Sequence, residues 1–240
     1  KRFNATSLVS GRAGFQSATG AMLAFEGNPL FSIYSYDWAG LDPQTGDPMG
    51  YLNGQVSKDY REIITETTPE ALVFHGSARP TVFGSFRNDF RYREFSLSVN
   101  IGYKLGYYFQ RRSVSTNLQQ VLMTAGHSDF ARRWQRAGDE RITDVPSMVY
   151  PNNTNRENFY SRAAVLVEPA DHIRLQDAWL AYDVSFARPS DRFGISGMQV
   201  YAYLNNLGLL WKANDKGIDP DVRENFPTPL TISLGIKMDF

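Results

Sequence analysis

The three histidines are the residues best suited to ligate a metal or to act as a general base. His75, His127 and His172 lie far apart in the chain, and none has a histidine or glutamate at the His-x-x-x-His or Glu-x-x-His spacing of a metal site. There is no cysteine, which excludes thiol nucleophiles and Cys-based zinc sites. No phosphate-binding glycine loop or Gly-x-Ser-x-Gly motif occurs. The sequence therefore predicts no catalytic residue, no metal and no cofactor.

A short acidic segment around Gly46 has some features of a calcium loop. Asp42, Thr45 and Asp47 supply oxygen ligands, but the Asp-x-Asp-x-Asp-Gly spacing and the distal glutamate are absent. The same residue types are common in turns. We expect an ordinary turn here.

Three tryptophans are candidate ligand contacts, because all of them lie in segments predicted to be loops. Trp38, Trp134 and Trp211 could stack on sugar rings or pack against the side chains of a substrate or partner. The alternative for each is packing within the loop or membership of an aromatic girdle at a membrane interface.

A larger polar group alternates with apolar residues along predicted strands. Successive side chains of a strand point to opposite faces, so the polar members should share one face and the apolar members the other. The polar positions that we expect to line a lumen or contact a plug are Arg87, Asp89, Lys104, Gln199, Tyr201, Tyr203, Lys237 and Asp239.

The alternation itself predicts five strands, near residues 80–92, 94–109, 171–186, 197–206 and 230–240. In the third of these the alternation changes phase at Gln176 and Asp177, which indicates a β-bulge. The second would extend roughly 50 Å at about 3.3 Å per residue, whereas a typical strand has about 5 to 6 residues. Residues 30–38 could form loop structure or part of a sixth strand.

The connections alternate in length. They are short at 91–93 and 188–195, and long at 38–79, 111–170 and 208–227; short helices are expected at 117–124 and 129–136. Outer-membrane barrels have short periplasmic turns and long extracellular loops in this alternation. No apolar run approaches the roughly 18 residues of a membrane helix. The predicted fold is all-β, a transmembrane antiparallel β-barrel wall whose long loops are extracellular.

Composition agrees with this fold class. The chain has 240 residues, aromatic residues make up 14%, and 25 basic residues balance 25 acidic ones. Aromatic residues favour strands, and zero net charge gives no reason to expect nucleic acid as a partner.

Over nearly all of its length the chain resembles the C-terminal part of SusC/RagA-like TonB-dependent outer-membrane transporters. The order and spacing of several segments carry the resemblance. They are Gly27–Tyr36, Trp38–Pro43, Pro80–Phe90, Tyr92–Val99, Asp171–Asp177, Ala181–Ser185, Asn205–Asn214 and Gly217–Asp221, followed by the alternating strand that ends at Phe240.

The resemblance implies a 22-stranded barrel filled by a plug, like other plugged transporters, in the bacterial outer membrane with its C-terminus in the periplasm. It implies import of a nutrient, with an oligosaccharide favoured over a peptide, a SusD-like lipoprotein as lid, TonB as energy source, and Phe240 as the assembly signal. The alternatives are a surface-exposed barrel without transport activity and a soluble sugar-binding β-protein.

Residues 1–240 contain no counterpart of the family's plug, TonB box or first strands, and the N-terminus has no signal-peptide pattern. Five or six strands cannot close a barrel, and open strand edges are not tolerated in lipid. We therefore expect the whole chain to be the C-terminal part of a barrel, completed by the N-terminal segment of the same transporter and surrounded by outer-membrane lipid.

Overall fold

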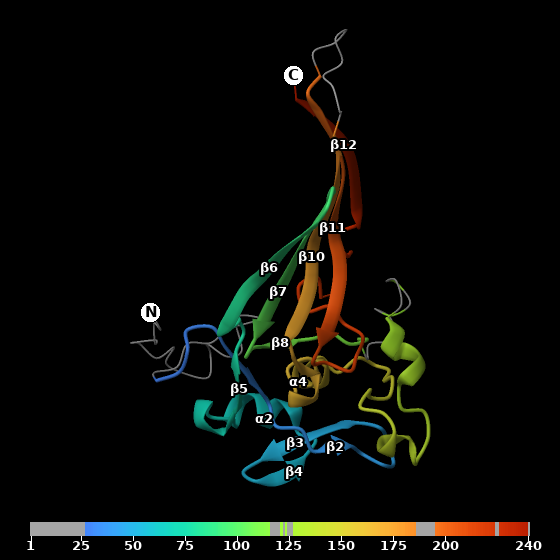
Figure 1. Ribbon diagram of the computed structural model, residues 1–240. Helices are drawn as coiled ribbons and strands as arrows, with labels where there is room; N and C mark the ends of the chain where they lie inside the picture. Colours follow the sequence, from blue (N-terminus) through green and yellow to red (C-terminus); the bar gives the residue numbers. More distant parts are fainter. Residues whose placement is uncertain are drawn as a thin grey trace. The chain divides into compact units, whose positions relative to one another are not determined.

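The computed structural model describes residues 27–115, 121, 123, 127–185, 195–223 and 226–239. The chain forms two compact units (Figure 1). Unit 1 contains Lys1–Arg79 and Tyr107–Pro169, and unit 2 contains Pro80–Gly106 and Ala170–Phe240.

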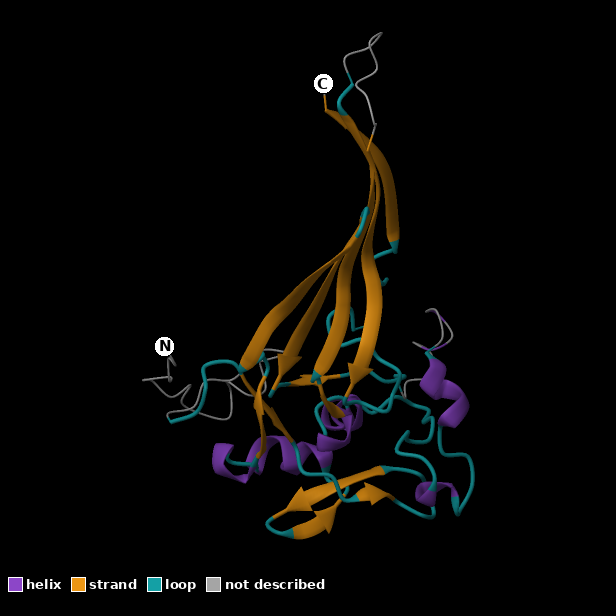
Figure 2. Ribbon diagram, in the orientation of Figure 1, coloured by secondary structure: helices purple, strands orange, loops and turns teal. Residues whose placement is uncertain are grey.

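Unit 2 is a five-stranded antiparallel sheet in which every strand lies beside its neighbour in sequence within the unit, in the order β12-β11-β10-β7-β6. Figure 2 shows its strands as long arrows running side by side. The all-β prediction is confirmed for this unit. The sheet is open, with β6 and β12 at its edges, so the described residues do not close a barrel. The strands are β6 (Val82–Tyr92), β7 (Phe95–Leu105), β10 (His172–Ser185), β11 (Gly197–Lys212) and β12 (Thr231–Asp239).

The strand ends differ from the prediction in two places. β7 stops at Leu105, and Gly106 follows with a φ of +72°, a conformation that suits glycine because it has no Cβ. β11 continues to Lys212, six residues beyond the predicted end at residue 206. The hairpin between β6 and β7 turns at Arg93, whose φ is +53°.

The predicted bulge in β10 is confirmed. Leu175 and Asp177 pair with the adjacent residues Ile101 and Asn100 of β7, so Gln176 is the extra residue. A register shift occurs at the same place against β11. The bulge keeps the apolar side chains before and after it on the same face.

The sheet has one apolar face and one polar face. Directly paired residues share a face, and the pairs Phe90↔Leu97 and Ala202↔Leu234 show that the apolar side chains of neighbouring strands coincide. Asn88 interrupts this face. Much of the face is exposed, with Leu234 at 80% and Phe86 at 61%. Its larger members include Phe86, Phe90, Tyr92, Phe95, Leu97, Val99, Ile101, Leu180, Tyr182, Val200, Leu204, Ile232, Leu234, Ile236 and Met238.

Unit 1 combines short strands and helices. β1 (Ser32–Ser35) pairs with β5 (Val73–Ser77), β8 (Tyr108–Gln110) pairs with β9 (Val167–Pro169), and β2 (Gly40–Leu41), β3 (Pro48–Leu52) and β4 (Gln55–Ser57) form a third sheet. The helices whose bounds lie within the described residues are the α-helices α2 (Tyr60–Glu66) and α4 (Thr154–Tyr160) and the 3-10 helices η1 (Pro69–Ala71), η2 (Ser128–Arg132), η3 (Asp139–Arg141) and η4 (Ala164–Leu166).

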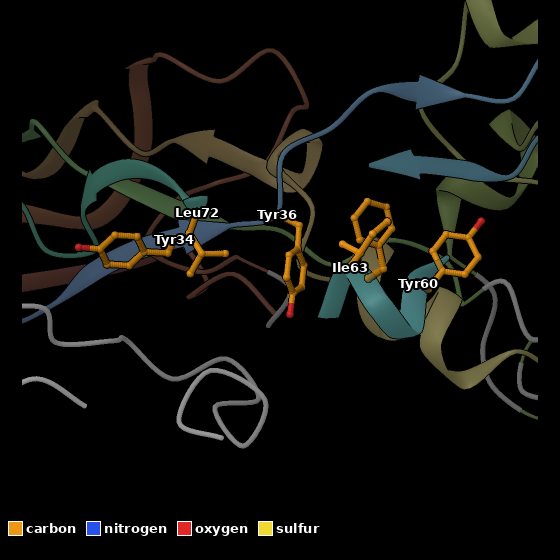
Figure 3. Packing of buried hydrophobic residues seen from close by; sticks show 6 residues of the cluster. Tyr34, Tyr36, Tyr60, Ile63 and Leu72 are labelled. Carbon is orange, nitrogen blue, oxygen red and sulfur yellow. The ribbon is translucent and has the colours of Figure 1, made fainter. Parts of the chain in front are cut away.

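Aromatic rings form the core of unit 1. Phe159 of α4 is fully buried, and its ring centroid lies 5.7 Å from that of Tyr36 and 5.6 Å from that of Tyr60. Ile63 of α2 and Leu72 belong to the same cluster (Figure 3). Each α-helix begins at a side chain that caps it: Asp59 accepts from the Glu62 amide, and Asn153 from the Arg156 amide. The core thus packs α2 against α4, with Tyr36, which directly follows β1, in the same cluster.

Two further predictions concern unit 1. Residues 30–38 contain β1, a short strand of this unit. In place of the helix expected at 129–136 there is a short 3-10 helix, η2, which ends at Arg132. The helix expected at 117–124 lies almost wholly outside the described residues. In the described part of the chain, no helix is long and apolar enough to cross a membrane.

Candidate functional site

The polar face of the unit 2 sheet is the candidate site. The register places all eight predicted lining residues on this face: Arg87 pairs with Asn100, Asp89 with Ser98, Lys104 with His172, Gln199 with Asp183 and Lys237, Tyr201 with Gly235, Tyr203 with Trp179 and Ser233, and Asp239 with Gly197. The structure therefore brings together residues spread over about 150 positions of sequence.

An ion pair crosses three strands at the middle of the face. Arg87 on β6 donates to Asp177 on β10 at 3.0 Å and to Ser98 on β7 at 3.1 Å. Asn100 donates to the other oxygen of Asp177 at 2.8 Å. Serine on the intervening strand is small enough for the guanidinium to pass over it. Asp177 is buried, and these donors satisfy its charge.

A second polar contact crosses the sheet toward the hairpin end. Arg91 on β6 lies 3.3 Å from Asp183 on β10, and Gln199 on β11 donates to the same carboxylate at 2.6 Å. Arg91 is largely exposed, so this pair contributes little to stability. The Asp183 carboxylate orients the Gln199 side chain on the polar face.

Three aromatic residues lie between these polar contacts. Trp179 of β10 pairs with Tyr203 of β11, and the ring centroids of Trp179 and Tyr201 are 6.5 Å apart. The Tyr201 ring occupies the space that a side chain at Gly235 would fill. Glycine at this position therefore allows the ring to lie against β12. Such rings can stack on a sugar or pack on apolar peptide side chains.

The end of the face opposite the hairpin holds a third charged cluster. Lys104 donates to Asp221 at 2.6 Å, and His172 Nε2 lies 3.2 Å from the other oxygen of that carboxylate. Arg174 donates to Asp219 at 2.6 Å. Hydrogen bonding to His172, reinforced by Lys104, holds the pKa of Asp221 well below its usual range. A cavity of about 320 Å³ adjoins the cluster.

The remaining predicted residues make fewer contacts on this face. Asp89 is exposed in the middle of β6, and Lys237 lies 3.3 Å from Asp239 on β12. Phe240, the predicted assembly signal, lies outside the described residues.

The tryptophans predicted as loop contacts have three different environments. Trp38 packs on Phe159 and Tyr160 in unit 1, and Trp134 packs over Gly46 while donating to Glu140 at 3.3 Å. The loop prediction for Trp211 was wrong: it lies in β11, pairs with Ile173 on the apolar face, and is 48% exposed. That position suits an interfacial girdle.

Several residues of the face were not singled out from the sequence. They belong mostly to β10, where His172, Arg174, Asp177, Trp179 and Asp183 occupy the polar phase once the bulge is taken into account. The phase change at Gln176 was the signal that could have identified them. Asp219 and Asp221 follow β11 in a loop, where no alternation exists to indicate their partners.

The acidic segment around Gly46 in unit 1 has basic side chains as partners. Lys58 pairs with Asp42 at 2.5 Å, and Arg156 donates to Asp47 at 2.9 Å. The hydrogen bond from Lys58 lowers the pKa of Asp42. Asp42 also accepts from the amides of Gln44 and Thr45, as an ordinary turn does. Among the described residues, no group of three or more histidine or acidic side chains could hold a metal.

Comparisons with known proteins support the fold. No protein-family model matches the sequence, and no curated protein matches it. The solved RagAB peptide transporter is similar, with a TM-score of 0.68 and 21% identity over 93% of this chain. The RagAB peptide importer is similar in its "open-open" state, with a TM-score of 0.67 and 20% identity, and in its "closed-closed" state, with 0.65 and 22%, again over 93% of this chain.

The chain spans 24% of the length of each of these solved chains. Identity at this level establishes the fold alone. Over 93% of its length, this chain therefore has the fold of about a quarter of a RagAB transporter chain.

Proposed function

We propose that this chain forms part of the wall and mouth of a SusC-like, TonB-dependent transporter that imports a nutrient across the bacterial outer membrane. Unit 2 supplies wall strands, with the apolar face toward lipid and the polar face toward the lumen or plug. Unit 1 contributes extracellular loop structure, and the end of the chain lies in the periplasm.

The two-faced sheet is the observation that carries this proposal. Leu234, Phe86 and Phe90 are 80%, 61% and 59% exposed on the apolar face, whereas a soluble monomer rarely exposes an apolar patch beyond a few hundred Å². Covering each large apolar side chain is worth about 1.5 to 3 kcal/mol. Lipid covers such a face in an outer-membrane barrel.

The opposite face has the chemistry of a lumen. Charged residues there are paired across strands, as in Arg87–Asp177, and aromatic rings lie among them. A soluble sugar-binding sheet would need a second layer over the apolar face. A barrel without transport activity would have the same polar interior, so the uptake experiment below distinguishes it. Both remain outcomes that experiment can return.

The remaining strands and the plug would come from the N-terminal segment of the same transporter. A SusD-like lipoprotein would cover the mouth, and TonB would supply the energy. The solved neighbours are a peptide transporter and importer, while the sequence resemblance favours an oligosaccharide. The proposed cargo is one of these two polar oligomers.

Uptake by cells tests the proposal. We expect cells that carry the whole transporter to accumulate a radiolabelled oligosaccharide or peptide, and cells with the gene deleted to lose this uptake. An uncoupler should abolish it, because TonB depends on the inner-membrane gradient. The proposal would be contradicted if uptake of every oligosaccharide and peptide tested persisted after gene deletion, or persisted after addition of the uncoupler.

A further inference from the structure

Residues 213–223, which follow β11, form a strap that is held against the polar face of its own sheet. Its two acidic side chains carry the attachment: Asp219 accepts from Arg174 at 2.6 and 2.5 Å, and Asp221 accepts from Lys104 at 2.6 Å. His172 Nε2 lies 3.2 Å from Asp221. Lys104 lies at the end of β7, and His172 and Arg174 lie at the start of β10.

The strap is preorganised to present these carboxylates. Asn214 brackets its centre, donating to the Ile218 carbonyl at 3.0 Å and accepting from the Ile218 amide at 3.2 Å. Gly217 has a φ of +77°, which permits the reversal between them. The Asp219 carbonyl accepts from the amides of Val222 and Arg223 at 3.2 and 2.7 Å. These internal hydrogen bonds support the turn that presents the two carboxylates to the wall.

The wall groups form a compact receptor for carboxylates. Lys104 and Arg174 are basic side chains that donate to carboxylates, and the His172 side chain is 2% exposed. The adjoining cavity of about 320 Å³ is lined by Phe83, Ser85, Lys104, His172, Arg174 and Asp221, among others. This volume is at the lower end of the range of about 300 to 1,000 Å³ for small-molecule sites. There is room beside the bound carboxylates for part of a larger molecule.

We propose that Lys104, His172 and Arg174 form a subsite for a carboxylate of the transported molecule, and that Asp219 and Asp221 of the strap occupy this subsite when cargo is absent. The inference rests on the transport function proposed above. The ligand chemistry is a carboxylate, which an acidic sugar or a peptide could supply.

Exchange of one carboxylate for another makes this arrangement workable. An incoming carboxylate would accept the same charge-assisted hydrogen bonds that Asp219 and Asp221 give up, so the wall cations are never left without a partner. The strap competes as a tethered ligand with an effective concentration on the order of mM. Cargo that binds the subsite would therefore release the strap, and the strap would return after the cargo moves on.

The first experiment measures binding to the whole transporter in detergent. The probes are galacturonate with galactose as its neutral partner, and N-acetyl-dialanine with its C-terminal amide. The double variant Asp219→Asn and Asp221→Asn should bind one carboxylate probe about tenfold more tightly than the parent protein does, and the neutral probe without change. The probe that gains identifies the source of the carboxylate. Adding Arg174→Gln should remove the gain.

The matched control is Asp215→Asn. Asp215 lies on the same strap, is 82% exposed and pairs with its neighbour Lys216, so its loss should leave affinity unchanged. A double variant that gains no affinity for carboxylates, or gains equally for the neutral probes, would overturn the proposal.

A second measurement uses the protein without substitutions. Saturating carboxylate probe should speed deuterium uptake at residues 218–223 toward the rate of the double variant, and the neutral probe should not. An unchanged exchange rate would show that the strap stays bound to the wall in the presence of the carboxylate probe and has a purely structural role. If the strap proposal fails while cells still show energy-dependent uptake, the transport proposal stands. If the uptake experiment finds no energy-dependent uptake by the whole transporter, both proposals fail.

Discussion

At the scale of single residues, the buried ion pair between Arg111 and Asp129 in unit 1 has the clearest energetic consequence. Arg111 donates to Asp129 at 2.7 Å, and the two side chains are 4% and 7% exposed. Burial alone would raise the pKa of Asp129, but hydrogen bonds from Ser113 and Arg111 outweigh it and the pKa lies below its usual value. The carboxylate is thus charged and depends on its donors.

Arg111→Gln should destabilise unit 1 by on the order of 3 kcal/mol, because it leaves Asp129 buried with fewer charged partners. Arg132→Gln is the control. Arg132 lies 3.9 Å from the same carboxylate and is 49% exposed, so its loss should cost under about 1 kcal/mol. Hydrogen exchange at residues 127–133 compares the two; equal protection would show that burial does not strengthen the Arg111 pair.

Residue types and their phase along a strand are visible in the sequence, but partners are not. Arg87 and Lys104 were assigned to one face from local alternation, yet Asp177 and Asp221 lie 90 and 117 positions away from them. Which carboxylate meets which cation depends on the register between strands. That register is fixed by side-chain burial and bulges across the whole sheet.

At the scale of elements, β12 gives the sharpest test of the two faces. Leu234→Arg places a charge on the apolar face and should cost about 2 to 4 kcal/mol if the position lies near the bilayer midplane. Ser233→Arg, one residue away and also exposed, places it on the polar face opposite Tyr203 and should be tolerated. The heat-modifiable fraction of the whole transporter on a gel reports assembly, and equal assembly of the two variants would contradict the lipid-facing assignment.

The five strands and the bulge in β10 could be predicted, because period-two alternation is local. The end of β11 could not. Asn206 and Gly208 have φ values of +58° and +120°, and register shifts against β10 occur in this stretch, so the alternation is lost before the strand ends. Trp211 was consequently assigned to a loop, although backbone pairing continues through it.

At the scale of the whole molecule, the open sheet requires partners for β6 and β12, the two edge strands. Exposed edges of this length are templates for aggregation. We expect the N-terminal segment of the transporter to cover both. The number of strands in the sequence was enough to predict that further strands are needed to close a barrel. The division of the chain into two compact units was not predicted, because it depends on contacts between segments that are distant in sequence.

Deletion of Phe240 tests assembly of the whole protein. The resemblance implies that this residue guides insertion, so the deletion should lower the amount of transporter in the outer membrane several-fold. Phe240→Tyr, which keeps an aromatic ring, is the matched control and should assemble nearly as well. Surface labelling of intact cells gives the amounts; undiminished labelling after deletion would assign assembly to other parts of the chain.

The bulge at Gln176 bears on how such a sheet can change over evolution. Elsewhere in a two-faced strand, gaining or losing one residue exchanges lipid-facing and lumen-facing side chains along the remainder of that strand. Leu175 and Asp177 already face consecutive residues of β7, so the loss of Gln176 would leave every pairing with β7 in place. Single-residue length variation in homologous chains is therefore expected at this position and in the loops, and changes elsewhere in the strands are expected in steps of two.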